Sequence, residues 1–257
     1  MTEFCTVDDR GWLAIITLDR TVRKNALHPA AHHELERVFD DLETRHDLRC
    51  IILTGAGDSF CAGYDLKDNL ETGVMEVASK GFGGLTGRTD YGIPVIAAVN
   101  GIAFGGGFEM VLACDLVIAS SAARFALPEA KVGWSPLAGG LQRLPRIIGL
   151  TRALGIALTG RVVSAEEGER SGFVNLVVEP GQLLSTAIEW AGMVADGAPL
   201  AIACNREVAK ASIDMDSLAA ALDVSNYASV APLLASKDAT EGKRAFAEKR
   251  HPIWRGV

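Results

Sequence analysis

Two glycine-bearing segments are the part of this chain best suited to binding a carbonyl oxygen: Phe60–Leu66 and Gly105–Glu109. Their small residues let a ligand approach the backbone N–H groups, and the second segment is predicted to begin a helix, whose first N–H groups have no partner inside the helix. Two N–H donors directed at one point form an oxyanion hole, which stabilises negative charge developing on a carbonyl oxygen. The segments therefore predict an enzyme that acts on an activated carbonyl, although close packing of a helix on a sheet would also favour glycine there.

Two glutamates in apolar surroundings could supply acid–base chemistry. Glu109 is in the first turn of the predicted helix, and Glu129 follows Pro128 in a predicted turn. Burial raises the pKa of a carboxyl group whereas a helix N-terminus lowers it, and such opposed effects tune catalytic acids and bases. The pair could flank a reacting carbon–carbon bond, one activating water and the other exchanging a proton with carbon. Read singly, each could also be a helix-stabilising or solvated glutamate.

Short apolar strands and amphipathic helices alternate up to about residue 195, which predicts parallel sheets with crossover helices. The continuous apolar runs indicate strands that are buried on both faces. The expected strands are Trp12–Leu18, Cys50–Leu53, Val95–Val99, Leu116–Ala119 and Arg124–Ala126, and the expected helices are Pro29–Arg45 and Gly106–Cys114. Between Gly73 and Gly92, a glycine-rich stretch could be either a mobile flap over a site or a surface connection.

The pattern after Gly197-Ala198-Pro199 is helical only, with expected helices at Leu200–Ala211, Ser217–Ala235 and Ala239–Arg250. This change predicts two regions, 1–197 and 198–257. His28 and His32 have the i, i+4 spacing of a zinc site, but no His-Glu-x-x-His pattern is present and a solvated helix face is the expected role.

Composition limits the classes of partner and compartment. The chain has 257 residues, 49% hydrophobic and 22% charged, and a formal charge of −7, which disfavours nucleic acid as a partner. Its acidic N-terminus does not resemble a signal peptide, and its most apolar stretch is too short and interrupted to span a bilayer. Five scattered cysteines without a C-x-x-C pair indicate reduced thiols. The sequence predicts a soluble cytoplasmic protein without a membrane partner.

Six motifs together carry a resemblance to a known family. They occur in the family's order at Lys24–Leu27, Phe60–Leu66, Gly101–Glu109, Phe125–Gly133, Ala138–Pro145 and Glu241–Phe246. Over essentially its whole length the chain resembles the crotonase superfamily, the enoyl-CoA hydratases and isomerases. The resemblance implies an α/β fold, a crotonase-type spiral of ββα units with a C-terminal helical trimerisation region, and a homotrimer or homohexamer built as a dimer of trimers.

The resemblance also implies the chemistry. The backbone N–H groups of Tyr64 and Gly106 would hold the thioester oxygen of an acyl-CoA. Family hydratases keep both glutamates, which favours enoyl-CoA hydratase activity: Glu129 would exchange the proton at C2, and Glu109 would activate the water that attacks C3. No metal or cofactor is implied, because coenzyme A is part of the substrate. The alternatives are another crotonase reaction, such as isomerisation or dehydration of a functionalised thioester like carnitinyl-CoA, and a non-catalytic acyl-CoA-binding protein.

The remaining implied contacts are with coenzyme A and the acyl chain. Arg23 and Lys24 would lie near the phosphates, the backbone around Ala62 near the adenine and pantetheine, and Phe246 and Lys249 in a neighbouring subunit's site. The full set of expected substrate-binding residues is Arg23, Lys24, Ala26, Ala62, Asp65, Leu66, Trp134, Phe246 and Lys249. Tyr64 and Trp134 depart from the family's usual residues, so a straight-chain acyl substrate is not implied.

Overall fold

The computed structural model describes residues 2–257 and divides into two compact units, Met1–Ala191 and Gly192–Val257. The first unit is a mixed α/β structure with two sheets, so the predicted fold class is confirmed. The boundary expected from the sequence, between 197 and 198, is close to this division. The role of the second unit in trimer formation stays a prediction.

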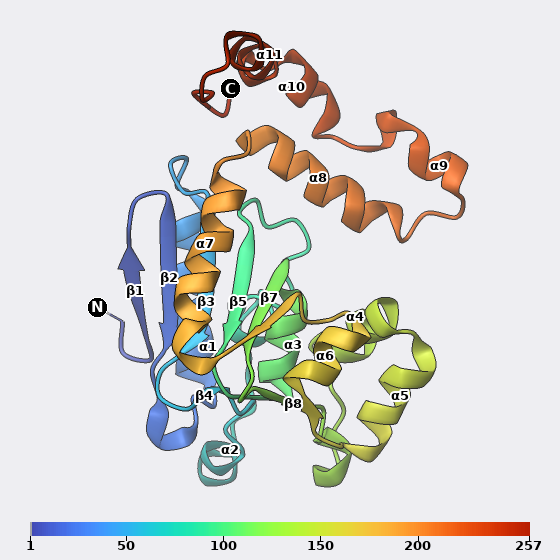
Figure 1. Cartoon of the computed structure of the whole chain (residues 1–257). Coiled ribbons are helices and arrows are strands. Elements are labelled where there is room, and N and C mark those ends of the chain that lie inside the picture. The colour runs from blue at the N-terminus through green and yellow to red at the C-terminus, as the bar shows by residue number, and fades with distance from the viewer. Residues whose placement is uncertain (1) are drawn as a thin grey trace. The chain divides into compact units, whose positions relative to one another are not determined.

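A six-stranded sheet forms the frame of the first unit (Figure 1), with the strand order β1-β2-β3-β5-β7-β10. Only β1 runs antiparallel to its neighbour; the other pairs are parallel. The strands are β1 Cys5–Asp9, β2 Leu13–Leu18, β3 Cys50–Gly55, β5 Val95–Val99, β7 Leu116–Ser120 and β10 Leu176–Val178. Four of the five predicted strands lie in this sheet and the fifth, Arg124–Ala126, lies in the second sheet, whereas β1 and β10 were not expected.

A second sheet of four strands has the order β4-β6-β8-β9. These strands are β4 Ser59–Cys61, β6 Ile102–Phe104, β8 Arg124–Ala126 and β9 Val163–Ser164. Each of the pairs β3/β4, β5/β6 and β7/β8 places its first strand in the large sheet and its second in the small sheet before a helix follows. This repetition is the predicted spiral of ββα units.

The large sheet is buried on both faces, as its continuous apolar runs predict. Alternate residues of β2, such as Ile16 and Leu18, face a core that they share with α1 and α3. Leu13 and Ile15 face a second core, which the apolar side of α7 covers (Figure 1). The helices of this unit are α1 Pro29–Glu43, α2 Leu66–Thr72, α3 Gly106–Ala113, α4 Gly140–Ile148, α5 Leu150–Thr159, α6 Ala165–Ser171 and α7 Leu183–Ala195, and the 3-10 turns are η1 Thr21–Arg23, η2 Phe82–Gly84, η3 Glu129–Val132 and η4 Pro180–Gln182.

Most of the glycine-rich stretch between Gly73 and Gly92 is packed against α1. The Gly83 N–H donates to His32 Nδ1 at 2.9 Å, and the buried Arg88 guanidinium bonds to Asp40 and Glu43. Only the part before residue 78 is exposed throughout. The sequence left open whether this stretch was a flap or a surface connection, and neither description fits residues 78–91. We call these residues the wall segment.

Replacing Gly84 by alanine should strongly destabilise the protein. Gly84 has φ +62°, and a Cβ there would lie 2.4 Å from Glu36 Cα in the backbone of α1. Strain and overpacking together should cost about 3 kcal/mol of unfolding free energy, measured by urea denaturation. Gly92→Ala is the matched control, because no atom lies within 4 Å of its added Cβ. Equal stabilities of the two variants would contradict the packing described for the wall segment.

The second unit is helical, with α8 Pro199–Ser212, α9 Leu218–Leu222, η5 Val224–Asn226, α10 Val230–Ala235 and α11 Lys237–Glu248. The single helix expected over Ser217–Ala235 is wrong, because it is broken after α9. There the Glu207 carboxylate accepts the N–H groups of Ala228 and Ser229, and the Tyr227 hydroxyl donates to Ala221 O at 2.6 Å. The N–H groups of Ala228 and Ser229 thus bond to a side chain on α8 where a continuous helix would have paired them with its own carbonyl groups.

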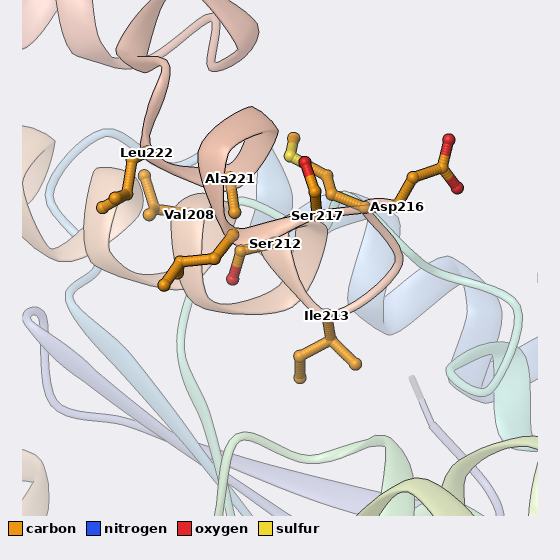
Figure 2. Close-up of a pocket in the computed structure, with 9 residues that line it drawn as sticks. Val208, Ser212, Ile213, Asp216, Ser217, Ala221 and Leu222 are labelled. Carbon is orange, nitrogen blue, oxygen red and sulfur yellow. The ribbon is translucent and has the colours of Figure 1, made fainter.

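Figure 2 shows a pocket in this second unit, lined by residues between Val208 and Leu222. None of the residues that the sequence singled out for chemistry lines it. Among residues 2–257, no single helix is both long and apolar enough to cross a membrane. Only two segments counted together, Pro180–Ala195 and Pro199–Ser212, reach the required length and composition.

Candidate active site

The residues predicted to act on a carbonyl follow the carboxyl ends of three neighbouring parallel strands. In the small sheet β6 pairs with β4 on one side and with β8 on the other, all three parallel. Parallel strands bring their carboxyl ends to one edge, so the segments that leave them meet there. Tyr64 follows β4, Gly106 follows β6 and Glu129 follows β8. The topology thus gathers residues that are distant in sequence.

The two predicted oxyanion amides lie in neighbouring segments at this edge. Leu27 forms a parallel bridge to Tyr64 in which the Leu27 N–H donates to Gly63 O and its carbonyl accepts from Asp65 N–H, both at 2.9 Å. This pairing directs the Tyr64 N–H away from Leu27. A Cβ on Gly63 would lie 3.4 Å from the nitrogen of Gly106, the first residue of α3. Within residues 2–257 neither the Tyr64 nor the Gly106 N–H donates a hydrogen bond, so both are available to a ligand.

Glu109 is buried in the first turn of α3. The Gly140 N–H donates to its Oε1 at 2.8 Å. Burial raises the pKa of Glu109 to about 7, and the charge of Glu129 adds to this rise. The N–H groups of Gly140 and Ala138 and the charge of Arg143 act in the opposite direction. A carboxyl group whose pKa is near neutrality is suited to both accepting and donating a proton.

Glu129 begins η3, directly after Pro128, and is also buried. Burial raises the pKa of its carboxyl group. A Cβ on Gly105 would lie 2.9 Å from Glu129 Oε1, so this carboxyl lies against the residue that precedes the Gly106 amide. Within the described chain Glu129 Oε2 is buried without a hydrogen-bond partner. Such an atom is costly unless a ligand or water satisfies it, which is typical of a functional group.

The two carboxyl groups together can hold one proton at neutral pH. Burial raises the pKa of both carboxyl groups, and the charge of Glu129 further disfavours ionisation of Glu109. One glutamate is then available as an acid and the other as a base. This arrangement can add water to a double bond beside a carbonyl, and it can remove water to form such a double bond.

Comparison with known proteins places the chain in a family. A sequence model described as enoyl-CoA hydratase/isomerase matches residues 9–257. The chain belongs to this family. Like its other members it is an enzyme of the crotonase type, which acts on acyl-CoA thioesters, and the resemblance inferred from the six motifs is confirmed.

Individual members of this family are similar to the chain over their full length. The chain is 42% identical to a carnitinyl-CoA dehydratase from Shigella flexneri over 264 residues, covering 100% of both chains. It is 41% identical to one from Proteus mirabilis with the same coverage. Crystal structures of enoyl-CoA hydratases from Mycobacterium tuberculosis and Mycobacterium marinum superpose with TM-scores of 0.92, at 37% and 39% identity and 99% coverage of each chain.

In this family member, the loop expected to bind coenzyme A is joined to the segment that leads from β4 to Tyr64. Lys24, in the left-handed region at φ 50°, accepts the Ala62 N–H through its carbonyl at 3.0 Å. The Ala26 carbonyl accepts from Arg20 Nη1 at 2.8 Å. Arg23 ends η1 next to this loop. The structure thus brings these predicted coenzyme A residues together, and their contacts with coenzyme A stay predictions.

Asp65 has a structural partner that the sequence did not reveal. Its buried carboxylate accepts from Arg20 Nη1 at 2.6 Å, and Arg23 Nε lies 4.0 Å away. It also caps α2 by accepting the N–H groups of Lys67 and Asp68. These contacts hold the pKa of Asp65 below its ordinary value despite burial. These contacts therefore hold the backbone in place directly after the Tyr64 amide. They account for the Asp65 carboxylate without a contact to substrate.

The other predicted substrate-binding residues are exposed. Leu66 begins α2, and Trp134 follows η3, where its backbone N–H donates to the Glu129 carbonyl at 2.9 Å. Phe246 and Lys249 lie at the end of α11 in the second unit. Their contribution to a coenzyme A site stays a prediction.

Two residues beside the candidate site were not predicted to be there. His32, expected on a solvated face, is buried: it stacks on Tyr64 with 5.6 Å between ring centroids and meets Phe82 edge-on at 4.5 Å. Burial lowers its pKa to about 3, so it is neutral. Phe82 in turn lies where a Cβ of Gly106 would be. Periodicity on α1 alone does not reveal this burial, because the wall segment that covers His32 is distant in sequence.

No metal site is evident in the described part of the chain. Among residues 2–257 no group of three or more His, Cys, Asp or Glu side chains is placed to hold an ion. The expectation that the reaction needs neither metal nor cofactor stays a prediction.

Proposed function

We propose that this protein is a dehydratase of a functionalised 3-hydroxyacyl-CoA, and that carnitinyl-CoA is its substrate. The observation that carries this proposal is the 42% identity to carnitinyl-CoA dehydratase across the full length of both chains. It replaces the simple enoyl-CoA hydratase favoured by the sequence motifs and adopts the dehydration that they left as an alternative. The buried pair Glu109 and Glu129 supports it, because removing water from a thioester needs a base and an acid.

The proposed reaction assigns a role to each group. The Glu129 carboxylate removes the proton from C2, and the N–H groups of Tyr64 and Gly106 hold the thioester oxygen as it gains negative charge. The C3–O bond then breaks, and protonated Glu109 gives its proton to the departing hydroxide. The products are water and a 2,3-enoyl thioester. The reverse sequence adds water, so one proton on the pair serves both directions.

Trp134 is the residue that suits the functional group of this substrate. The carnitinyl group carries a quaternary ammonium next to C3, and such cations bind to the faces of indole rings with about 1–2 kcal/mol. Trp134 is exposed and joined through its backbone N–H to the Glu129 carbonyl. An indole ring on a residue that is hydrogen-bonded to the proposed base, Glu129, favours a cationic acyl group over an alkyl chain.

A second candidate is hydration of an unsubstituted enoyl-CoA. It is favoured by the solved enoyl-CoA hydratases, which superpose with TM-scores of 0.92 at 37% and 39% identity. The same residues would perform the reaction, so the two candidates differ in the acyl group and not in the acid–base chemistry.

The test is the ratio of kcat/KM for carnitinyl-CoA to kcat/KM for 3-hydroxybutyryl-CoA, with the enoyl product measured by mass spectrometry. We expect the ratio to exceed about 10, and Trp134→Leu to lower it about tenfold by removing the cation–π contact. Glu129→Gln, purified in the same way, controls for contaminating host enzyme. A ratio below one would favour the unsubstituted substrate, and tight binding of both thioesters without turnover would favour a binding protein.

A further inference from the structure

Arg143, on α4, connects the two sides of the candidate site. Its Nη2 donates to the Thr86 carbonyl in the wall segment at 2.7 Å. The Thr86 hydroxyl in turn accepts the Phe82 N–H at 2.8 Å. The Phe82 ring lies 2.4 Å from where a Cβ of Gly106 would be. The guanidinium is thus linked, through Thr86, to the backbone of Phe82, whose ring lies beside Gly106.

The same guanidinium fills the space above the turn that holds Glu109. A Cβ on Gly139, which has φ +112°, would lie 1.9 Å from Arg143 Nη1. The next residue, Gly140, donates its N–H to Glu109 Oε1 at 2.8 Å. The Arg143 N–H donates to the Gly139 carbonyl at 2.8 Å. Arg143 therefore contacts this turn twice, through its guanidinium beside Gly139 and through its backbone N–H.

Arg143 is also the cation that acts on Glu109. The helix that carries Glu109 packs against α4, β4, β6 and η2. The charged side chains that act on its carboxyl group are Glu129, on η3, and Arg143, on α4. The charge of Glu129 disfavours the Glu109 carboxylate and that of Arg143 favours it. The buried thiol of Cys61 and the imidazole of His32 are uncharged at neutral pH, because burial raises the pKa of Cys61 to about 12 and lowers that of His32 to about 3.

We propose that Arg143 is a positioning residue for Glu109. By occupying the space above Gly139 it fixes the turn whose Gly140 N–H orients the carboxyl, and its positive charge favours the ionised form of that carboxyl. The catalytic part of this proposal rests on the proposed function, in which Glu109 exchanges a proton with water.

The first test needs no substrate. The pH dependence of the unfolding free energy, compared between Arg143→Met and Arg143→Met/Glu109→Gln, reports the ionisation of Glu109 in the absence of the cation. We expect its midpoint to lie at a higher pH than for the corresponding comparison with Arg143 intact, because removal of a nearby cation disfavours the carboxylate. Arg143→Lys should return the midpoint to near its original pH. Arg146→Met, which removes a cation from an exposed position on the same helix, should leave it unchanged.

The second test is the pH profile of kcat. Arg143→Met should lower kcat about tenfold and move both limbs to higher pH while KM stays within about twofold, because it orients a catalytic group and does not contact substrate. Arg143→Lys should keep the limbs of the wild-type pH profile but lower kcat. A lysine retains the charge but cannot both donate to the Thr86 carbonyl and fill the space beside Gly139, as the planar guanidinium does. If Arg143→Met does not fold, Arg143→Gln provides a neutral side chain that still donates hydrogen bonds.

Unchanged midpoints and limbs in both neutral variants would overturn the proposal, as would an equal shift in Arg146→Met. A lack of turnover on carnitinyl-CoA with a shifted unfolding midpoint would instead contradict the proposed function and leave the charge effect of Arg143 supported.

Discussion

Replacing Glu109 by glutamine should abolish most turnover and at the same time stabilise the protein at neutral pH. Glutamine keeps an oxygen that accepts the Gly140 N–H, but it cannot exchange a proton with water. The rate should therefore fall about 10²- to 10⁴-fold, the usual contribution of a general acid or base. Steady-state kinetics on carnitinyl-CoA measure this loss.

The gain in stability follows from the raised pKa. In the folded protein the pKa of Glu109 is about 7, against an ordinary value of 4.5. Between these values the folded state binds more protons than the unfolded state, so the wild-type protein loses stability as the pH rises from about 4.5 to above 7. The loss from this group is on the order of 3 kcal/mol, since one pKa unit corresponds to about 1.4 kcal/mol.

Glu109→Gln carries no such charge, so its stability relative to wild type should increase over this pH range. Urea denaturation of both proteins at pH 5 and pH 8 measures the difference. Parallel stability curves would show that burial does not keep the Glu109 carboxyl protonated. A protein stabilised by the loss of a catalytic group is expected where a buried charge is needed for function.

Replacing Glu129 by glutamine should stop proton exchange at C2. Its Oε2 is buried without a hydrogen-bond partner in residues 2–257, so this oxygen is available to accept a proton from substrate. Turnover should fall about 10²- to 10⁴-fold, and the dissociation constant of a non-reactive acyl-CoA should change by less than about threefold, because the oxyanion amides belong to the backbone.

Incubation of butyryl-CoA in heavy water, followed by NMR of the C2 position, isolates this step from the loss of water. The wild-type protein should incorporate deuterium and Glu129→Gln should not. Glu189→Gln, the same chemical change on the exposed side of α7, is the matched control and should exchange at the wild-type rate. Exchange at that rate in Glu129→Gln would assign the base to another residue.

The sequence predicted four of the six strands of the large sheet because their apolar residues are contiguous. Val95–Val99 in the large sheet and Arg124–Ala126 in the small sheet have the predicted bounds. The sequence also identified the glycine segments and both glutamates, since carboxylates in apolar surroundings and adjacent glycines are visible locally. The roles assigned to these residues remain to be tested.

Contacts between distant segments were not predictable in the same way. The sequence analysis assigned no role to Arg20 or Arg143, yet one pairs with the buried Asp65 and the other bonds to Thr86. The wall segment lacks periodicity because it follows the surface of α1 without forming long elements. The continuous helix expected over Ser217–Ala235 failed for a related reason: the carboxylate that interrupts it, Glu207, lies on another helix.

The position of the Tyr64 N–H, the proposed oxyanion donor, is set by the path of the backbone and does not depend on the side chain at position 64. This N–H is oriented by the bridge to Leu27 and by the anchoring of Asp65 to Arg20. Evolution can therefore change the side chain at position 64 without deleting the donor, and this chain has a tyrosine that stacks on His32. Protein engineering can use the same property: libraries of substitutions at positions 64 and 32 can be screened for new acyl groups while the backbone N–H groups proposed to bind the carbonyl stay in place.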